Sequence, residues 1–219
     1  MSEPTERSRI RKKPERARPD PAFRDAVLDE GLVCHLSWVE RGAPCVLPMA
    51  YVRVGDELHL HGSREQRALV HMAAGGEVCA CVTLVDALVL ARSAKNHSLN
   101  YRCVVAWGRG REIDELAAKR ASLAALVEHV VPGRGGGSRA PTEAELRATR
   151  VCAIRLDEWS CKQRDDGPRD YPQDLALAHW AGIVPLGIAV GEPRQEVGPA
   201  GELALPAHVR AWRRGRAPH

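Results

Sequence analysis

The sequence of 219 residues predicts a mainly β protein, with an antiparallel core to which a few helices are added. Short β-rich runs follow one another with hairpin-type turns between them, as in residues 32–39 and 43–54. One short helical pattern is inserted among these runs, and the longer helical patterns come late in the chain. Because strands and helices do not alternate, a parallel sheet is not indicated. A closed or partly closed barrel would remove the edges of so many short strands.

Composition divides the chain into three parts. Residues 1–20 are rich in arginine and proline and are expected to form a disordered basic tail. One folded domain is predicted over residues 21–186. Residues 187–219 have a weak pattern with many Gly and Pro, and form a C-terminal extension, either a tail or an arm lying on a partner. No run approaches about 20 apolar residues and no apolar segment follows the N-terminal charges, so we expect a cytoplasmic protein without a membrane span.

The first elements are a short helix and a β-hairpin. The helix is predicted over residues 23–31, with Gly31 closing it. The runs 32–39 and 43–54 then form a hairpin around the sequence "ERG". Pro48 in the second run lacks an amide donor, so it indicates an edge or a bulge.

A further strand and a second helix follow. The strand is predicted over residues 57–61, and the helix over residues 63–76. Ser63 and Gln66 fit a capping box at the start of this helix. A tandem glycine closes it.

The second half of the chain alternates between strands and late helices. Two strands are predicted at "EVCACVTLV" and "ALVLARSA", with Asp86 at the turn between them. Thr142 and Glu145 form another capping box, which predicts a short helix after them. The remaining expected elements are a strand over about 101–111, a helix over about 115–131 and a last core strand over 150–162.

Several classes of partner are not indicated. The seven cysteines are scattered and several lie in apolar runs, so they are expected to be free thiols rather than disulfides or zinc ligands. The net charge of +4 comes largely from the two ends of the chain. Since aromatic residues make up only 4%, a nucleic-acid surface is not expected.

The stretch "HLHGSREQR" offers a possible anion site. Ser63 is either simply a helix cap or part of a helix start that also receives a phosphate. Arg64 and Arg67 would add charge-assisted hydrogen bonds to such an anion. Local sequence leaves both interpretations open.

The stretch "HSLNYRCVVAWGRG", residues 97–110, concentrates donors and acceptors at the start of an apolar strand. Alternation places Tyr101 and Cys103 on one face of this strand and Arg102 on the other. The stretch is either an ordinary loop entering a sheet or the lining of a polar ring ligand. His97 by itself is more commonly a surface residue than a ligand or catalyst.

Four segments together resemble a known family: "LHGSREQRAL", "LVLARSAKNHSLNYRCVVAWGRG", "VPGR" and "WAGIVPL". They are similar to the flavin-nucleotide-binding branch of the pyridoxamine 5′-phosphate oxidase-like family, which also resembles the nitroimidazole-resistance reductases. The similarity covers residues 23–186 in the same order. The resemblance implies a six-stranded antiparallel split β-barrel that forms a homodimer and binds FMN in clefts between the two subunits.

The resemblance also implies the cofactor contacts. It places His61, Ser63 and Arg64 near the FMN phosphate, and Pro48, Met49 and Ala50 along the isoalloxazine edge. It places Asn100, Tyr101, Arg102 and Cys103 beside the flavin. Lys162 and Trp180 would lie on the pocket wall across the dimer interface.

The sequence departs from the branch in two places. Cys103 stands where the branch usually has serine, and it is a weaker donor with a redox-sensitive thiol. The pyridoxal-phosphate contacts of the true oxidases are not recognisable in residues 187–219, so oxidation of pyridoxamine phosphate is not expected.

The expected function is that of an FMN-dependent oxidoreductase acting on a small organic substrate. No catalytic residue is identified; His97 and Tyr101 are the candidates for a proton donor. The alternative is a non-catalytic haem or flavin carrier or sensor, with His61 or His97 as an iron ligand. A barrel that has lost its cofactor and serves as a dimeric scaffold is a third possibility.

Overall fold

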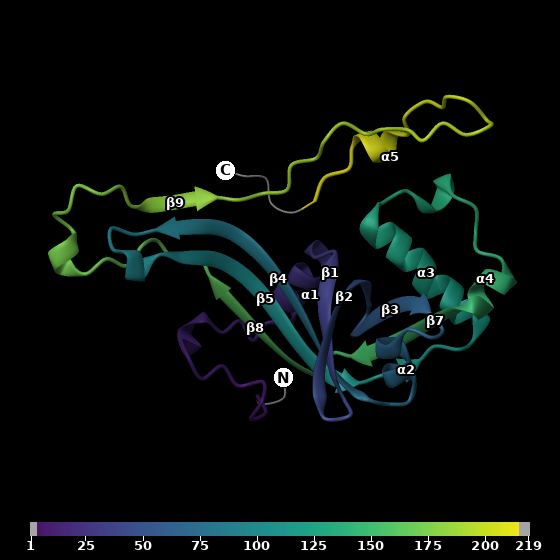
Figure 1. The fold of residues 1–219 in the computed structure, drawn as a ribbon, viewed down its shortest axis with the longest axis horizontal. Helices are drawn as coiled ribbons and strands as arrows, with labels where there is room; N and C mark the ends of the chain where they lie inside the picture. The colour runs from purple at the N-terminus through teal and green to yellow at the C-terminus, as the bar shows by residue number, and fades with distance from the viewer. Residues whose placement is uncertain (1–3, 215–219) are drawn as a thin grey trace.

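The computed structural model describes residues 4–214 and pairs nine antiparallel strands into one curled sheet (Figure 1). The strands lie in the order β6-β7-β3-β2-β1-β4-β5-β8, and β9 adds to β4. Their bounds are β1 Val33–Glu40, β2 Ala43–Val54, β3 Glu57–Ser63, β4 Glu77–Leu90, β5 Ser98–Arg109, β6 Arg111–Glu112, β7 Thr149–Arg155, β8 Glu158–Arg164 and β9 Gly182–Pro185. The antiparallel, mainly β fold is confirmed. The six strands implied by the resemblance are too few. The strand expected over residues 150–162 forms two strands, β7 and β8, and the short strands β6 and β9 also join the sheet.

Five α-helices accompany the sheet in the described chain. They are α1 Pro21–Glu30, α2 Arg67–Ala73, α3 Leu116–Val130, α4 Glu143–Ala148 and α5 Ala207–Arg210. The capping box before α4 is confirmed: the Thr142 hydroxyl accepts from the Glu145 amide at 3.2 Å, and the Glu145 carboxylate accepts from the Thr142 amide at 2.8 Å. The predicted helix over 115–131 is also confirmed, with the Glu115 carboxylate capping its first turn.

The β1–β2 hairpin forms as predicted. Arg41 and Gly42 form its turn, and both have positive φ angles of 51° and 80°, as tight hairpin turns require. Pro48 faces His35 of β1 on one side, whereas the β2–β3 ladder on the other side begins only at Tyr51. Pro48 therefore lies in a part of β2 that is a sheet edge. An edge was one of the two predictions for Pro48, the other being a bulge, and it is confirmed.

The turn expected at Asp86 is wrong. β4 runs without interruption from Glu77 to Leu90, and its register to β5 shifts between Val85 and Ala87. Such a bulge leaves one residue unpaired and redirects its side chain. The Asp86 carboxylate uses this freedom to bind Arg102 of β5.

The single strand expected over residues 150–162 is two strands. β7 pairs with β3 and β6, whereas β8 pairs with β5 at the other end of the sheet. Leu156 and Asp157 connect them. β7 lies near one end of the strand order and β8 lies at the other end. Because these two strands are consecutive in the chain, their short connection brings the two ends of the sheet together and curls it.

The helix expected to begin at Ser63 begins at Arg67. Ser63 is the last residue of β3 and pairs with Thr149 of β7. Gln66 takes the N-cap position without a side-chain cap, and its amide instead contacts the Met49 sulfur at 3.9 Å. The capping box at Ser63 is therefore wrong, because pairing with β7 keeps Ser63 in the sheet.

Gly31 closes α1 through close packing and not through a left-handed conformation, since its φ is −68°. A Cβ at this position would lie 2.6 Å from both the Tyr51 hydroxyl and Val82 Cγ1. Tyr51 is fully buried and donates to the Leu28 carbonyl at 2.6 Å. The C-terminal end of α1 is thus pressed directly onto the core of the sheet.

The segment expected to be a disordered tail packs along β8 in its described part. Ala17 forms a β-bridge with Lys162, and the Arg18 amide donates to the Cys161 carbonyl at 3.0 Å. Further along, Arg7 forms ion pairs with Glu77 and Glu158. These contacts hold residues 4–20 against the domain.

The C-terminal extension is held between β9, which precedes it, and a contact beyond α5. β9 pairs with residues 87–90 of β4, and residues 186–206 then run past the sheet to α5 (Figure 1). Beyond α5, the Trp212 indole donates to the Val130 carbonyl at 2.7 Å. The described chain between these anchors is almost entirely exposed.

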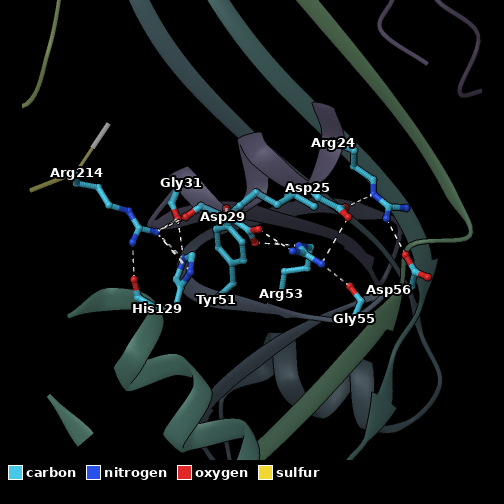
Figure 2. A network of polar contacts seen from close by, with 11 residues as sticks. Arg24, Asp25, Asp29, Gly31, Tyr51, Arg53, Gly55, Asp56, His129 and Arg214 are labelled. Atoms are coloured by element: carbon cyan, nitrogen blue, oxygen red, sulfur yellow. Dashed lines mark hydrogen bonds and ion pairs between the residues drawn. The ribbon is translucent and has the colours of Figure 1, made fainter. Parts of the chain in front are cut away.

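Figure 2 shows the polar network at the C-terminal end of α1. The Arg214 guanidinium donates to the carbonyls of Asp29, Glu30 and Gly31 at 2.7, 2.8 and 3.1 Å. His129 also donates to the Gly31 carbonyl, at 2.8 Å from Nε2. These bonds satisfy carbonyls that a helix end leaves free and place a cation at the negative end of its dipole.

Acidification below about pH 6.5 is expected to destabilise the fold through His129 of this network and through His61, which lies outside it. Burial, followed by the Arg214 cation, lowers the pKa of His129 from its usual 6.5, and burial also lowers that of His61. The unfolded chain therefore binds protons at a higher pH than the folded chain, so stability falls as pH falls through this range. Urea unfolding at about pH 7.5 and about pH 5.5 measures the effect. His129→Gln should reduce the difference between the two pH values, and an unchanged difference would assign it to other groups.

Candidate functional site

The residues predicted on β2 and β3 meet where these strands part. The β2–β3 ladder extends only from Val54 and Glu57 to Tyr51 and Leu60. Beyond it, Pro48, Met49 and Ala50 pair with β1, whereas His61 and Ser63 pair with β7. We call this opening the β2–β3 mouth. The Gln66 side chain reaches across it to Met49.

Arginines surround the β3 side of the mouth. The side chain of Arg64 is 46% exposed, and its guanidinium lies 3.4 Å from the Arg147 carbonyl and 4.0 Å from Glu112. Arg150 donates to the Arg64 carbonyl and pairs with Glu112 at 3.3 Å. Because α2 has only seven residues and begins at Arg67, a phosphate here would depend on these arginines and not on a helix terminus.

His61 lies under α3 rather than in the open mouth. Its ring lines a small pocket with Ser122 and Leu126 of α3. The Nδ1 atom is buried and has no partner among the described residues. Because burial lowers the pKa of His61, the ring is neutral at neutral pH.

The outer face of the large sheet carries the second set of predicted residues. On β5, Tyr101 and Cys103 face this side and lie opposite Arg164 and Lys162 of β8. The alternation along β1, β2, β4 and β5 places Pro48 and Ala50 on the same side. The structure therefore brings predicted residues of three strands to one surface.

Asn100 and Arg102 turn the other way, into the core. Arg102 is 3% exposed, and its guanidinium donates to Asp86 at 2.6 and 3.0 Å and to Glu30 at 2.8 Å. The Asn100 side-chain oxygen accepts from Arg164. These two residues therefore bind other side chains of this chain and hold β5 to its neighbours.

The outer face also exposes large apolar side chains. They belong to five strands and are 37–62% exposed: Val33 and Val39 of β1, Val46 of β2, Val85 and Leu88 of β4, Leu99 of β5 and Val184 of β9. Large contiguous apolar surfaces are typical of interaction sites. The predicted cofactor residues thus share their face with these exposed apolar side chains.

One chain does not bring all the predicted residues together. β1 and β4 separate the mouth from β5. His97 lies at the far end of the β4–β5 hairpin, where its Nδ1 donates to the Ser93 carbonyl at 3.0 Å and its ring is exposed. Trp180 lies on the chain entering β9 and is 66% exposed.

Burial raises the pKa of Cys103, so this residue is a protonated thiol at neutral pH.

A second potential site lies where the sequence did not indicate one. The N-terminal segment and β8 enclose a cavity lined by Trp159, over which Arg24 packs at 5.2 Å from the ring centre. Arginine and proline in residues 1–20 indicated disorder, so no cavity was expected there. The tryptophan between acidic and small residues at 157–161 was the available signal.

Two other classes of site receive no support from the described chain. Residues 4–214 contain no group of three or more His, Cys, Asp or Glu side chains arranged to hold a metal ion. No helix in this range is both long and apolar enough to cross a membrane.

Comparison with known proteins identifies the family. Residues 20–163 match the model of the pyridoxamine 5′-phosphate oxidase family. No curated protein matches the sequence. The flavocytochrome Anf3 from Azotobacter vinelandii is 31% identical, with 97% of this chain and 99% of that chain covered and a TM-score of 0.90.

Two further structures extend the comparison. A FAD- and haem-binding protein from Mycobacterium smegmatis is 34% identical over 91% of this chain and 98% of its own, with a TM-score of 0.86. A protein assigned to 5-nitroimidazole antibiotic resistance from Bacteroides thetaiotaomicron shares the fold at 18% identity, with 67% and 85% coverage and a TM-score of 0.58. The chain belongs to the pyridoxamine 5′-phosphate oxidase family.

Proposed function

We propose that the protein is a flavin-dependent oxidoreductase that acts on a small organic substrate. The observation that carries this proposal is the nearly full-length similarity to a flavocytochrome and to a FAD- and haem-binding protein, at 31% and 34% identity. The flavin, when bound, supplies hydride or electron transfer, while the protein binds and orients it.

The proposed flavin site combines the β2–β3 mouth with the outer face. Its contacts come from both regions, with Met49 and His61 turned inward beside the mouth and with Asn100 and Arg102 supporting β5 from behind. These contacts are Pro48, Met49, Ala50, His61, Ser63, Arg64, Tyr101, Cys103, Lys162 and Trp180. His97 and Tyr101 are the proposed proton donors. Because Nδ1–H of His97 is held by the Ser93 carbonyl, Nε2 of this ring takes up a proton before it donates one.

A homodimer is part of this proposal. The exposed valines and leucines of the outer face lie beside the proposed flavin contacts, so a second copy that covers them would also enclose the flavin. It would bring β5 and Trp180 of one subunit toward the mouth of the other, which no single chain achieves. Excluding water in this way strengthens the polar contacts to the cofactor.

We further propose that haem accompanies the flavin. The resemblance in sequence predicts FMN, whereas one of the two similar full-length structures is named for FAD, and both names include a haem or cytochrome component. We therefore expect a purified protein with a flavin spectrum and a Soret band. Chromatography of the cofactors released on denaturation distinguishes FMN from FAD. A colourless protein that takes up neither flavin nor haem would contradict the proposal.

Arg64→Ala is expected to weaken flavin binding about tenfold, because it removes a charge-assisted hydrogen bond to the phosphate. Titration of the apoprotein with FMN and with FAD, followed by flavin fluorescence, measures the effect. Arg155→Ala is the matched control. The Arg155 side chain is 69% exposed, pairs with Asp157 alone among residues 4–214, and lies at the opposite end of the β3–β7 pair. Equal affinities for the two variants would place the phosphate elsewhere.

A further inference from the structure

The C-terminal extension carries a run of apolar side chains that nothing in this chain covers. Residues 186–200 and 202–206 are all exposed. Their large apolar side chains are 38–64% exposed, namely Leu186, Ile188, Val190, Val197, Leu203 and Leu205. Exposed apolar side chains gathered in one segment are typical of interaction sites. We call residues 186–206 the clasp.

The clasp is fixed at its two ends but not along its length. Before it, β9 pairs with β4, and after it, Trp212 and Arg214 donate to backbone carbonyls of α3 and α1. Within the described chain, the hydrogen bonds of residues 187–205 are made only among themselves, as between the Leu203 amide and the Gln195 side chain at 3.0 Å. Its own subunit therefore holds the clasp in place without packing against it.

The clasp follows a defined course and is not a loose tail. Residues 186–190 continue from β9 in extended form, with a small residue between successive apolar ones (Figure 1). In an extended chain this alternation puts Leu186, Ile188 and Val190 on one face. A solved structure that matches 97% of this chain leaves only a few residues unmatched, so most of the clasp has a counterpart in it.

The surroundings of the clasp favour a second copy of this chain as its cover. The clasp continues from β9, whose exposed Val184 lies opposite Leu88 of β4, and Leu88 lies opposite Leu99 of β5. This apolar row belongs to the outer face, which a second copy covers in the proposed homodimer. The clasp therefore extends the same apolar surface beyond the edge of the sheet.

Charge favours the same partner. The clasp contains Glu192, Glu196 and Glu202 but only one cation, Arg194, so its net charge is −2, whereas the whole chain carries +4. The rest of a second copy is therefore positively charged and attracts the clasp. In a twofold dimer each copy gives one clasp and receives one.

We propose that the clasp of each subunit packs on a second copy of this chain and holds the homodimer together. The inference rests on the proposed function, which includes that homodimer, and it assigns the segment that stabilises it. The clasp also positions Trp180, whose ring lies so close to Gly182 of β9 that a Cβ there would be 2.8 Å from it. A clasp seated on the partner holds β9, and Trp180 with it, at the partner's flavin site.

Sedimentation equilibrium of the full chain measures the dissociation constant of the dimer. Ile188→Lys and Leu203→Lys should each raise this constant at least tenfold, because each puts a cation into an apolar contact on a positively charged partner. Val70→Lys is the control, since Val70 is 45% exposed on α2, outside the clasp and the outer face, and it should dimerise as the wild type does. All three positions are exposed, so the variants should unfold in urea as the wild type does.

Hydrogen exchange of the unsubstituted protein gives an independent measurement. The amides of residues 187–194 have no acceptor within the described chain, so slow exchange there requires a cover. They should exchange more slowly in the wild-type dimer than in dissociated Ile188→Lys. Equal exchange in the two, or equal dimerisation by the wild type and both clasp variants, would overturn the proposal.

Further outcomes separate the clasp from the proposed function. Slow exchange of residues 187–194 in a monomeric protein would assign the cover to the same chain and overturn the clasp. A wild-type protein that is monomeric at every concentration would refute the proposed homodimer and the clasp together. Dimerisation that depends on the clasp, in a protein that binds no flavin, would support the clasp and refute the proposed function.

Discussion

Arg102→Ala is expected to lower the free energy of unfolding by about 3 kcal/mol, because it leaves two carboxylates without their counter-ion. Arg102 is 3% exposed and binds Asp86 through Nε and Nη2 and Glu30 through Nη1 and Nη2. Its removal would strand these charges between α1, β4 and β5. The side chains of Glu30 and Asp86 remain 20% and 25% exposed, so partial hydration keeps the loss at the lower end of the usual range of about 3 to 5 kcal/mol.

Urea unfolding of Arg102→Ala and of Arg147→Ala gives the comparison. Arg147 forms an exposed pair with Glu143, and both side chains are more than 60% exposed. Its loss should change stability by less than about 0.5 kcal/mol. A triple variant with Glu30→Gln, Asp86→Asn and Arg102→Met should recover part of the lost stability, because it removes the stranded charges. If Arg102→Ala instead loses flavin while remaining as stable as the wild type, Arg102 acts as a cofactor contact.

The elements predicted correctly are those whose signals are local. The Thr142–Glu145 capping box and the turn at Arg41 and Gly42 depend on residues at most a few positions apart. The errors at Ser63 and Asp86 have the opposite cause. Ser63 is drawn into the sheet by β7, which lies about ninety residues later, and Asp86 is bulged out by its register with β5. Pairing between distant strands overrides a cap or turn signal that is valid on its own.

In the candidate site, too, local patterns were predicted correctly and contacts between distant segments were not. Alternation alone predicted that Tyr101 and Cys103 face away from Arg102, and the burial pattern of β5 agrees. Which of these two faces is the core could not be predicted, because the carboxylates that bind Arg102 come from α1 and from the bulge in β4.

The N-terminal segment illustrates a related limit of composition. Its arginines indicate disorder when the segment is considered alone. In the fold, Arg7 meets carboxylates from β4 and β8, at positions 70 and 151 residues away.

Gly110→Ala is expected to lower the free energy of unfolding by about 3 kcal/mol, at the upper end of the cost of overpacking. A Cβ on Gly110 would lie 2.4 Å from Cα, 2.5 Å from Cβ and 2.5 Å from the carbonyl oxygen of Met72. Met72 is fully buried in the core, so its backbone cannot retreat without opening that core. Gly110 is also held, since its amide donates to the Gly76 carbonyl at 2.9 Å.

Gly167→Ala is the matched control, because nothing lies within 4 Å of a Cβ at that position. It should be neutral or raise stability by up to about 1 kcal/mol, since alanine restricts the unfolded chain. Differential scanning calorimetry and urea unfolding measure both variants, and equal stabilities would show that α2 moves freely against the sheet. Such freedom would matter for the site as well. α2 follows directly on Gln66, whose side chain spans the β2–β3 mouth, so a displaced α2 should weaken flavin binding in Gly110→Ala while Gly167→Ala binds normally.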